Sequence, residues 1–479
     1  MDCMGIKRIR KSLLYGRLTC MGSNPHICYE DAQSQESASN HWSSTENNAS
    51  NAWNVNFGNS NVGNNNKFNR NQVRPVVACN DFDLLRESVI EAYLDCLRHK
   101  RSSKQAVEYM TEAYVDLPRL ARELYDRTYE IGTSTCFIVK YPKYREVFAA
   151  SFRDRIIHHW ICLRLNPLFE YQHRLLGDVS HNCRVGFGSK YSVREVAQAM
   201  KRISDKYRKE AYIYKGDMDS FYMRISKSLL WGKLKGFIEQ WYDGLDKSLL
   251  LWLTEKVVKH SPKKDCVLNS PPEYWTHLKP SKSLFRTDDD RGIPIGNLTT
   301  QIFANFFMLD MDRKAKELFA GLNYYYVRFV DDFVVICDDK KEMLRRVKVL
   351  EDFIEKELSL KVHRDKKYCQ KVSHGVKYVG AVIKNNRTYL SSRTLARFKE
   401  RVVGFNRVLS QDVVSLFDLL RIECVINSYL GFCVWHRTYR KRVEYIKMFV
   451  PSFWRYFYVK GHYQSIHIKK KFIKYLRNL

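Results

Sequence analysis

Hydrophobic residues recur at helical spacing along most of the chain after residue 80. In the segment FDLLRESVIEAYLDCLRHK, Phe82, Leu85, Val89 and Ala92 fall near one face, which predicts an amphipathic helix. The same spacing predicts further helices over residues 117–129, 152–166, 229–260, 295–319 and 342–360.

Two prolines set expected limits of these helices. Pro118 lies near the start of the helix at 117–129, where its missing N–H costs little. The helix at 152–166 is expected to end at Asn166, because the residue before Pro167 avoids the helical region.

Shorter runs rich in β-branched and aromatic residues predict strands between the helices. They are residues 136–150 (two strands around Pro142), 211–217, 323–330, 333–339 and 376–383. The third and fourth runs meet at Asp331-Asp332, which predicts a β-hairpin with two acids at its tip. Residues 261–292 are polar and proline-bearing, which predicts a loop or insertion, and the chain from residue 391 is basic and mostly helical. The mixture predicts an α+β fold.

Residues 1–78 differ from the rest of the chain. The stretch NHWSSTENNASNAWNVNFGNSNVGNNNKFNRNQVRPV is saturated with asparagine, which prefers turns and caps to helix or strand interiors. Few aliphatic residues are present to bury. We therefore expect a disordered N-terminal segment.

The chain is strongly basic. Its 81 Lys and Arg outnumber 52 Asp and Glu, giving a formal net charge of +29. Such an excess fits a polyanionic partner, because basic side chains that neutralise phosphates release condensed counterions. Nucleic acid is the favoured partner, and the alternatives are a basic protein without one and a binder of membrane surfaces.

Cysteine usage indicates a reducing compartment. The 13 cysteines form no CxxC pair and show no metal-ligand spacing, so we interpret them as free thiols. The basic N-terminus has no apolar signal-peptide core, and no window of 18 apolar residues occurs. We expect a cytoplasmic protein without a membrane partner.

The strongest candidate chemistry is the pair Asp331-Asp332. Adjacent acids raise each other's pKa unless a cation is close, and Mg²⁺ prefers hard oxygen ligands; an exposed turn is the alternative. Asp217 ends another predicted strand, so two strand ends would present carboxylates to two metal ions about 4 Å apart. One ion would lower the pKa of a primer 3′-hydroxyl, and the other would stabilise the pyrophosphate leaving group. Asp219 is a lesser candidate.

These acids belong to a series of motifs. YKGDMDSFY, RGIPIGNLTTQIFANFF, YVRFVDDFVV, LSLKVHRDKK and KYVGAVI resemble, in order and spacing, the first acidic palm motif, the template-contacting motif, the catalytic hairpin, the lysine motif and the primer grip of reverse transcriptases. The resemblance covers residues 81–479 and implies a right-hand polymerase. Its parts would be fingers (79–212), a palm of antiparallel sheet and helices (213–390) with a fingers insertion at about 225–290, and a basic helical thumb (391–479), after the Asn-rich segment (1–78).

A subfamily is also indicated. PKYREVFAASFRDRIIHHWICLRLNPLFE, HNCRVGFGSKYS and IGNLTTQ resemble the reverse transcriptases of diversity-generating retroelements. Relatives from group II introns and retrons usually have Pro-Gln-Gly where this chain has Pro294-Ile295-Gly296, and Thr300 replaces a typical Ser while keeping the hydroxyl. Apolar Ile295 predicts weaker discrimination beside the nascent base pair. The resemblance implies low-fidelity copying at template adenines.

The resemblance assigns catalysis and metal binding to a few residues. Asp217, Asp331, Asp332 and Lys366 would be catalytic, although the adjacent Lys367 leaves the register of the lysine open. Two Mg²⁺ ions, with Mn²⁺ as a substitute, would be held by the three aspartates and by the backbone carbonyl of Met218.

Further residues would bind nucleotide and template. The resemblance implies that dNTPs contact Lys143, Arg145, Tyr222, Gly296 and Gln301, with Tyr222 as a steric gate against the ribose 2′-hydroxyl. It implies template contacts for Arg153, Arg155, Gly292 and Ile295. The alternative interpretation of Tyr222 is a packed core aromatic. The alternative for Arg155 is a structural ion pair with Asp154. His158 and His159 do not share a helix face, so packing or RNA contact is expected rather than a metal.

The implied partners are template RNA, RNA–DNA duplex, dNTPs and a small basic accessory protein.

The Asn-rich segment resembles the variable end of a target protein of such retroelements. Their template repeats are adenine-rich, and AAY codons encode Asn, so we predict that this segment is a template repeat translated in frame. The alternatives are a retron, group II-like or phage-defence polymerase and a non-catalytic RNA-binding scaffold, which the intact acids disfavour. A surface-displayed target protein is suggested by the N-terminal segment alone.

Overall fold

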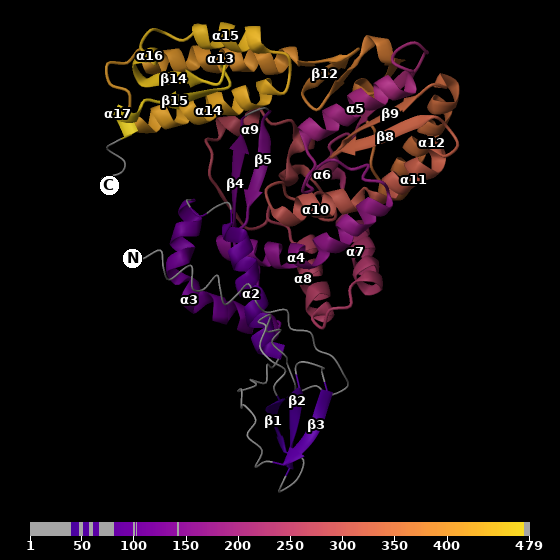
Figure 1. Ribbon diagram of the computed structural model, residues 1–479, viewed down its shortest axis with the longest axis vertical. Coiled ribbons are helices and arrows are strands. Elements are labelled where there is room, and N and C mark those ends of the chain that lie inside the picture. Colours follow the sequence, from indigo (N-terminus) through magenta and orange to yellow (C-terminus); the bar gives the residue numbers. More distant parts are fainter. Residues whose placement is uncertain are drawn as a thin grey trace. The chain divides into compact units, whose positions relative to one another are not determined.

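The computed structural model of the protein describes residues 40–46, 51–56, 61–66, 81–98, 101, 103–140 and 143–473 (Figure 1). The chain divides into two compact units, Met1–Glu130 and Ile131–Leu479. Among the described helices, none has the length and apolar character that crossing a bilayer requires.

The first unit contains a small antiparallel sheet (Figure 1). Its strands β1 (Asn40–Glu46), β2 (Asn51–Asn56) and β3 (Asn61–Asn66) pair in chain order. Over these strands the structure differs from the expected disorder, because a ladder uses main-chain groups that asparagine supplies as well as any residue. The rest of residues 1–78 lies outside the described residues, so disorder there stays a prediction.

Two helices follow in the described part of this unit. They are α2 (Asp81–Leu97) and α3 (Lys104–Tyr125). Val89 and Ala92 are buried on the predicted face of α2. The placement of Pro118 in a first turn was wrong, since it lies inside α3. An interior proline costs about 3 kcal/mol, which the burial of Leu120 and Leu124 on the same helix offsets.

A four-stranded antiparallel sheet lies at the centre of the second unit. Its order is β10 (Tyr368–Lys371), β6 (Tyr212–Asp217), β9 (Asp332–Cys337) and β8 (Tyr324–Phe329). The predicted hairpin of two hydrophobic runs is confirmed as β8–β9. Strand β9 is buried from Phe333 to Cys337, so the sheet is covered on both faces.

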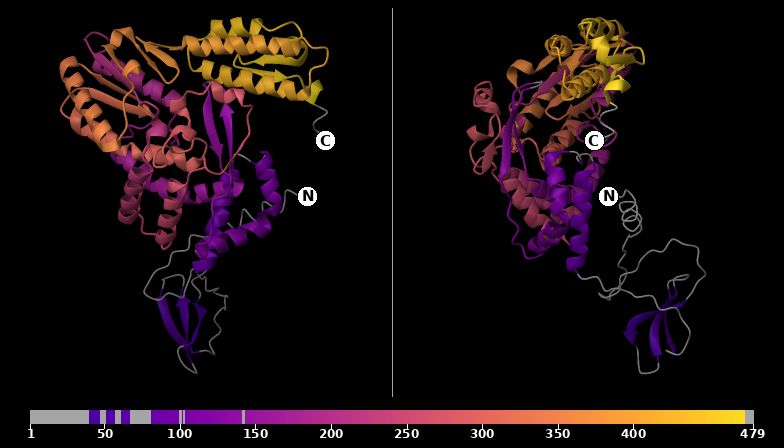
Figure 2. Two further views of the ribbon diagram at one scale, coloured as in Figure 1. Left: turned by 180° about the vertical axis from the view of Figure 1, so that it is seen from behind. Right: turned by 90° about the vertical axis from the view of Figure 1, so that its left-hand side faces the viewer.

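Different helices cover the two faces of this sheet (Figures 1 and 2). They are α5 (Ser189–Ile203) on one face, and α11 (Leu309–Phe319) and α12 (Lys340–Leu358) on the other. Ile213 packs with the apolar side of α5, whereas the next residue, Tyr214, donates its hydroxyl to Glu351 of α12. Alternation along β6 therefore fixes which helix each residue meets.

Two smaller three-stranded sheets flank this layer. One has the order β5 (Arg145–Ala149), β4 (Ser134–Val139) and β7 (Cys266–Leu268), and the other is β11 (Val376–Tyr378), β12 (Ala381–Lys384) and β13 (Arg387–Leu390). The strands expected on either side of Pro142 are present, and Pro142 itself lies outside the described residues. The single strand expected over 376–383 is instead a hairpin, because the chain turns at Val379-Gly380.

Helices surround these sheets, and several begin or end at unexpected residues. They are α4 (Phe152–Leu175), α6 (Phe221–Arg224), α7 (Lys227–Trp241), α8 (Lys247–Lys259), α9 (Glu273–Thr276) and α10 (Leu298–Phe307), with short 3₁₀ turns at Pro280–Lys282, Leu284–Arg286, Arg364–Lys366 and Val372–His374. The predicted end at Asn166 was wrong: α4 continues through Pro167, held by the burial of Phe169 between Phe237 and Phe306. The segment 229–260 is helical, as predicted, and forms two helices, α7 and α8, lying side by side (Figure 2).

The C-terminal part has its own hydrophobic core. It comprises α13 (Ser392–Leu409), α14 (Leu416–Val434), α15 (Tyr439–Lys447), α16 (Phe453–Tyr456), β14 (Phe457–Lys460), β15 (Ser465–Ile468) and α17 (Lys470–Ile473). Phe398, Ile422 and Phe453 are among the residues that fill this core. The expected helices are present, and a hairpin, β14–β15, runs beside α14 (Figure 1). The fold as a whole is α+β, as predicted, and the limits of fingers, palm and thumb stay a prediction.

Candidate active site

A tight turn joins β8 and β9 at the end of the central sheet. Phe329 pairs with Asp332, which leaves Val330 and Asp331 as the two loop residues. Val330 has a φ of 57°, a left-handed conformation that costs a β-branched residue on the order of 1–3 kcal/mol. Contacts elsewhere must therefore hold this turn in place.

Three carboxylates meet at this turn. Asp217 ends β6 and lies directly opposite Asp332 in the antiparallel pair β6–β9. Opposite residues project from the same face of a sheet, with Cβ atoms about 5 Å apart. The N–H of Met218 donates to the carbonyl of Asp331 at 3.1 Å, which ties the turn to the end of β6. Asp219 instead forms an ion pair with Arg224, whose Nη2 lies 2.8 Å from Asp219 Oδ2.

The surroundings of the carboxylates oppose their ionisation. Burial raises the pKa of Asp331, and the charge of Asp217 raises it further. Burial also raises the pKa of Asp332 to about 6, although Lys215, with Nζ 3.2 Å from Oδ1, opposes the shift. A divalent cation would favour the ionised form of both carboxylates.

The donor set fits a metal that arrives with a phosphorylated substrate. Among the described residues, no three or more His, Cys, Asp or Glu side chains enclose a metal position. Mg²⁺ in polymerase-type sites needs fewer protein ligands, because one or two carboxylates share it with substrate phosphates and water. Asp217 and Asp331, whose charges act on each other, meet that need.

Two adjacent lysines follow the sheet and have different partners. The Nζ of Lys366 forms an ion pair with Oδ2 of Asp217. The Nζ of Lys367 instead contacts Oε2 of Glu351 at 2.7 Å. Of the two, the geometry brings Lys366 to the acids.

Basic residues of the β4–β5 sheet face the same cluster. Burial lowers the pKa of Lys143, positive Lys366 lowers it further, and Asp217 raises it. Arg145 is the first residue of β5. Burial raises the pKa of Asp331, and the positive charge of Arg145 opposes this rise. These two predicted triphosphate contacts thus lie within electrostatic reach of the acids.

Lys282 is a basic residue of this cluster that the sequence did not reveal. It ends the 3₁₀ turn Pro280–Lys282 in the polar segment 261–292. Burial and the charge of Asp217 raise the pKa of Asp331, and the positive charge of Lys282 opposes this rise. Its neighbours are fixed by buried Glu146 of β5, which accepts from Ser283 Oγ at 2.8 Å and from the N–H of Leu284 at 2.7 Å. The segment is thus anchored beside the site.

Tyr222 and Gln301 both interact with Cys183, and Tyr222 also feels the charge of Asp331. Burial raises the pKa of the Tyr222 hydroxyl, as do the charges of Cys183 and Asp331. The Sγ of Cys183 donates to Oε1 of Gln301 at 3.6 Å. Tyr222 also packs against a small buried cluster that includes Phe148, together with partly buried Ile295. Tyr222 therefore has both a packing role and a position facing the site, and Cys183 was not predicted.

Two glycines let the loop before α10 pass close to other backbone. Gly296 has a φ of 138°, and a Cβ there would collide with the carbonyl oxygen of Phe148. Gly292 has a φ of 92°, and its Cβ would lie 2.6 Å from Leu284 Cδ1. Both glycines are required by contacts within the protein, and their expected contacts with nucleotide or template stay predictions.

Arg153, Arg155 and the histidines lie near the start of α4. Arg155 Nε donates to the carbonyl of Ala150 at 3.0 Å, while Asp154 caps the helix with Ser151. His158 is buried against Thr299, and burial lowers its pKa to about 3, so it is a neutral packing residue. Template contacts of Arg153 and Arg155 stay predictions.

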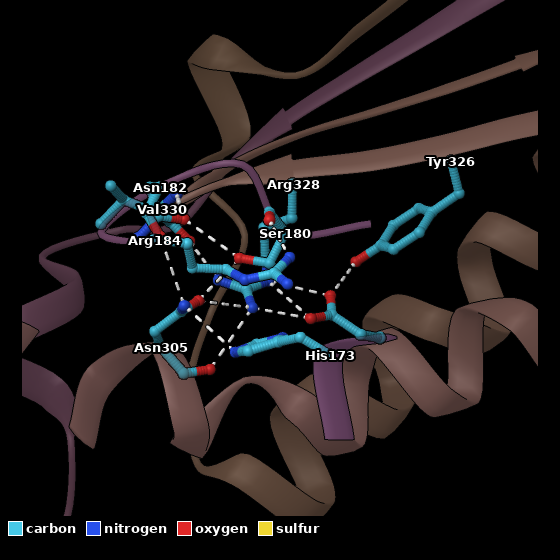
Figure 3. Close-up of polar contacts among 9 residues, drawn as sticks. His173, Ser180, Asn182, Arg184, Asn305, Tyr326, Arg328 and Val330 are labelled. Atoms are coloured by element: carbon cyan, nitrogen blue, oxygen red, sulfur yellow. Dashed lines mark hydrogen bonds and ion pairs between the residues drawn. The ribbon is translucent and has the colours of Figure 1, made fainter. Parts of the chain in front are cut away.

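A buried ion pair lies beside the β8–β9 turn (Figure 3). The side chains of Arg328 and Asp312 are fully buried and joined at 2.6 Å from Nη2 to Oδ2 and 2.9 Å from Nε to Oδ1. Tyr326 donates its hydroxyl to Asp312 at 2.7 Å, and Arg328 Nη2 donates to Asn305 Oδ1 at 3.0 Å. The charges of Arg328 and Asp312 therefore neutralise each other in the protein interior.

The same network holds the strained turn from two sides. Arg328 Nη1 donates to the carbonyl of Val330 at 3.1 Å, and the N–H of Val330 donates to Asn182 Oδ1 at 2.7 Å (Figure 3). Asn182 is itself buried. Both polar groups of the left-handed residue are therefore fixed by side chains, one from β8 itself and one from outside the hairpin. Of these residues, Arg328 was recognisable in the sequence as a single charge within a run of hydrophobic residues.

Comparison with known proteins adds to this geometry. The family model described as reverse transcriptase (RNA-dependent DNA polymerase) matches residues 138–383. No curated protein matches the sequence. Among solved structures, apo telomerase from Candida tropicalis is similar with a TM-score of 0.42 and 14% identity, over 66% of this chain and 58% of that chain. Telomerase from Candida albicans with a TWJ fragment of telomeric RNA gives 0.36 and 14%, over 72% and 57%.

The chain thus spans less than 60% of the length of these telomerase chains. The family match covers just over half of this chain and includes the central sheet, all three carboxylates and the turn that carries Asp331. The chain belongs to the reverse transcriptase (RNA-dependent DNA polymerase) family.

Proposed function

We propose that the protein copies a template-repeat RNA into cDNA with low fidelity at adenines, as the polymerase of a diversity-generating retroelement. The observation that carries the polymerase chemistry is the meeting of Asp217, Asp331 and Asp332 at one strained turn, where burial opposes the ionisation of Asp331 and Asp332. Two Mg²⁺ ions bound there would supply activation of the primer 3′-hydroxyl and stabilisation of the leaving pyrophosphate.

The residues of the chain would position the nucleotide. Lys143, Arg145 and Lys282 would face the triphosphate, since all three act electrostatically on the acid cluster. Lys366 would neutralise Asp217 before the metal binds and the leaving pyrophosphate afterwards, because one ammonium group cannot compete with Mg²⁺ for the same oxygen. Backbone contact of Met218 with a metal is part of the same proposal.

Selection of deoxynucleotides would depend on Tyr222. Its partly buried ring packs against Phe221 and the Ile295-containing cluster, so it cannot yield easily to an added 2′-hydroxyl. Gln301 would approach the nucleotide beside it, oriented by Cys183. A steric gate of this kind rejects the larger substrate by overlap rather than by a lost hydrogen bond.

The diversifying role is supported by the motif Ile295-Gly296-Asn297-Leu298-Thr299-Thr300-Gln301. Ile295 brings an apolar side chain to the loop before α10, where related enzymes have glutamine. Template RNA, an RNA–DNA duplex and a small basic accessory protein are the proposed partners, and template contacts would come from Arg153, Arg155 and Gly292. The free cysteines of the described residues agree with a cytoplasmic location.

Primer extension tests this proposal. The purified protein is given a defined RNA template, a primer, dNTPs and Mg²⁺, with and without any accessory protein encoded beside it, and every product is sequenced. We expect cDNA with errors concentrated at template adenines. Accurate cDNA would leave the polymerase and point to the retron or defence alternative. Bound RNA without any product would point to a non-catalytic scaffold.

A further inference from the structure

A basic groove of about 550 Å³ lies apart from the catalytic cluster. It is formed by α5, the turn between β12 and β13, and the end of α14. Six of its lining residues are cations, and no Asp or Glu lines it: Lys190, Arg194, Lys201, Lys384, Arg387 and Arg437. Such a concentration of one sign raises the local concentration of anionic ligands.

These cations have few partners of their own. Within the part of the chain that the structure describes, Arg194 pairs with Glu195 at 3.3 Å, and the other five form no ion pair. Lys384 and Arg387 lie directly opposite each other in the β12–β13 register. Like charges so placed destabilise a hairpin. An external anion would remove that repulsion.

The groove also presents an aromatic ring. Trp435, the residue after α14, is 54% exposed, and Lys190 Nζ lies 3.1 Å from its ring centroid. Partly buried Phe432 and the neutral His436, held by Thr388 at 3.2 Å, support the wall beside it. A half-exposed indole within a cationic groove suits the stacking of a nucleobase.

We propose that this groove binds a single-stranded nucleic acid, with phosphates on the cations and a base stacked on Trp435. An acidic polypeptide would satisfy the charges but gives no reason for the exposed ring. Two single strands have these phosphates and bases: RNA flanking the copied template, and newly made cDNA. Naming these two strands rests on the proposed polymerase function, whereas the affinity of the groove for a single strand does not.

Binding is measured with a fluorescent single-stranded RNA of about 12 nucleotides and a DNA of the same sequence. The full chain is first saturated with a short unlabelled primer–template hybrid, so that the labelled strand reports on sites outside the active site. The variants are Trp435→Ala and Lys384→Gln/Arg387→Gln. The control is Trp454→Ala, which removes a ring that is 40% exposed and does not line the groove.

We expect Trp435→Ala to weaken strand binding about tenfold, the usual effect of losing one base–aromatic stack. The double variant is expected to lower the slope of log affinity against log salt by about 1.4, since each neutralised phosphate of a single strand contributes about 0.7. Trp454→Ala should bind as the unmodified chain does. Extension of the short hybrid should stay within about twofold in every variant.

Two results would overturn the inference, and two others decide which strand the groove binds and whether the proposed function holds. Unchanged strand affinity in both groove variants, with extension intact, excludes the groove and leaves the polymerase standing. Tighter binding of polyglutamate than of either strand, lost in the double variant, would make the partner an acidic protein. Tighter binding of RNA or of DNA identifies which strand the groove takes. Failure of the unmodified chain to extend any primer refutes the proposed function separately.

Discussion

The strained turn that carries Asp331 depends on one hydrogen bond that is open to mutation. Asn182→Ala removes the acceptor of the Val330 N–H, which lies 2.7 Å away. Leaving that partly buried N–H unpaired costs about 1–3 kcal/mol, and the left-handed conformation of Val330 stores a similar amount. Because the two quantities are comparable, loss of the clamp lets the turn relax and moves the Asp331 carboxylate.

The assay is the single-turnover rate of nucleotide addition to a bound primer–template. A displacement of about 1 Å at reacting groups costs about 100-fold, so we expect Asn182→Ala to slow addition by that order while hybrid binding holds. Urea unfolding should show a loss of about 1–3 kcal/mol. The matched control is Val330→Gly, because glycine adopts a positive φ without steric cost. Alone it should change the rate by less than about threefold.

The double variant Asn182→Ala/Val330→Gly separates positioning from general damage. If Asn182 acts by holding a strained residue, removing the strain should recover at least about tenfold of the lost rate. A double variant as slow as Asn182→Ala would refute the clamp and reduce Asn182 to a packing residue.

Four further outcomes follow from the site. Asp331→Ala should abolish synthesis while leaving RNA affinity within about threefold in a filter-binding assay, and full activity would refute its metal role. Lys366→Gln should slow addition at least about tenfold whereas Lys367→Gln should not, because Lys366 alone pairs with an acid of the cluster, and equal single-turnover rates would contradict this. Tyr222→Ala should admit ribonucleotides, seen as alkali-labile products, and unchanged dNTP preference would make Tyr222 a core residue. Burial raises the pKa of Asp332 to about 6, so the folded state binds that proton more tightly than the unfolded chain does, and the metal-free protein loses stability as pH rises from about 4 through 6. Mg²⁺ should therefore raise the melting temperature more at about pH 8 than at about pH 5, and an equal rise at both would contradict the assignment.

Local patterns predicted the hairpin with Asp331-Asp332 at its turn, for a physical reason. The β8–β9 hairpin joins residues close in sequence, and hydrophobic runs on both sides of Asp331-Asp332 allow little else. The ends of helices were predicted less well. Pro118 and Pro167 are poor helix formers, yet each lies in a helix whose buried face outweighs the lost hydrogen bond. Propensity carries no information about that burial.

The residues that support the site were missed because their contacts are distant in the chain. Asn182 reaches Val330, and Glu146 reaches Ser283, only once the sheets have formed. Lys282 lies in a segment that reads as a loop, and nothing in its neighbours indicates the acids that it faces. A sequence identifies chemistry where adjacent residues carry it, and it leaves open which distant segment completes the site.

The two acidic sites beside the central sheet differ in how their charge is balanced, and this difference bears on what each can do. Asp312 of α11 pairs with Arg328 and accepts from the Tyr326 hydroxyl, so its charge stabilises the geometry of the turn. Asp331 and Asp332 lie where burial opposes their ionisation, and their pKa values rise although Lys215 contacts Asp332. If Arg328 instead donated to these two acids, it would favour their ionised form and occupy the oxygens that the proposed metal ions need. By donating to Asp312 and to the Val330 carbonyl, Arg328 orders the turn and leaves the oxygens of Asp331 and Asp332 open to those ions.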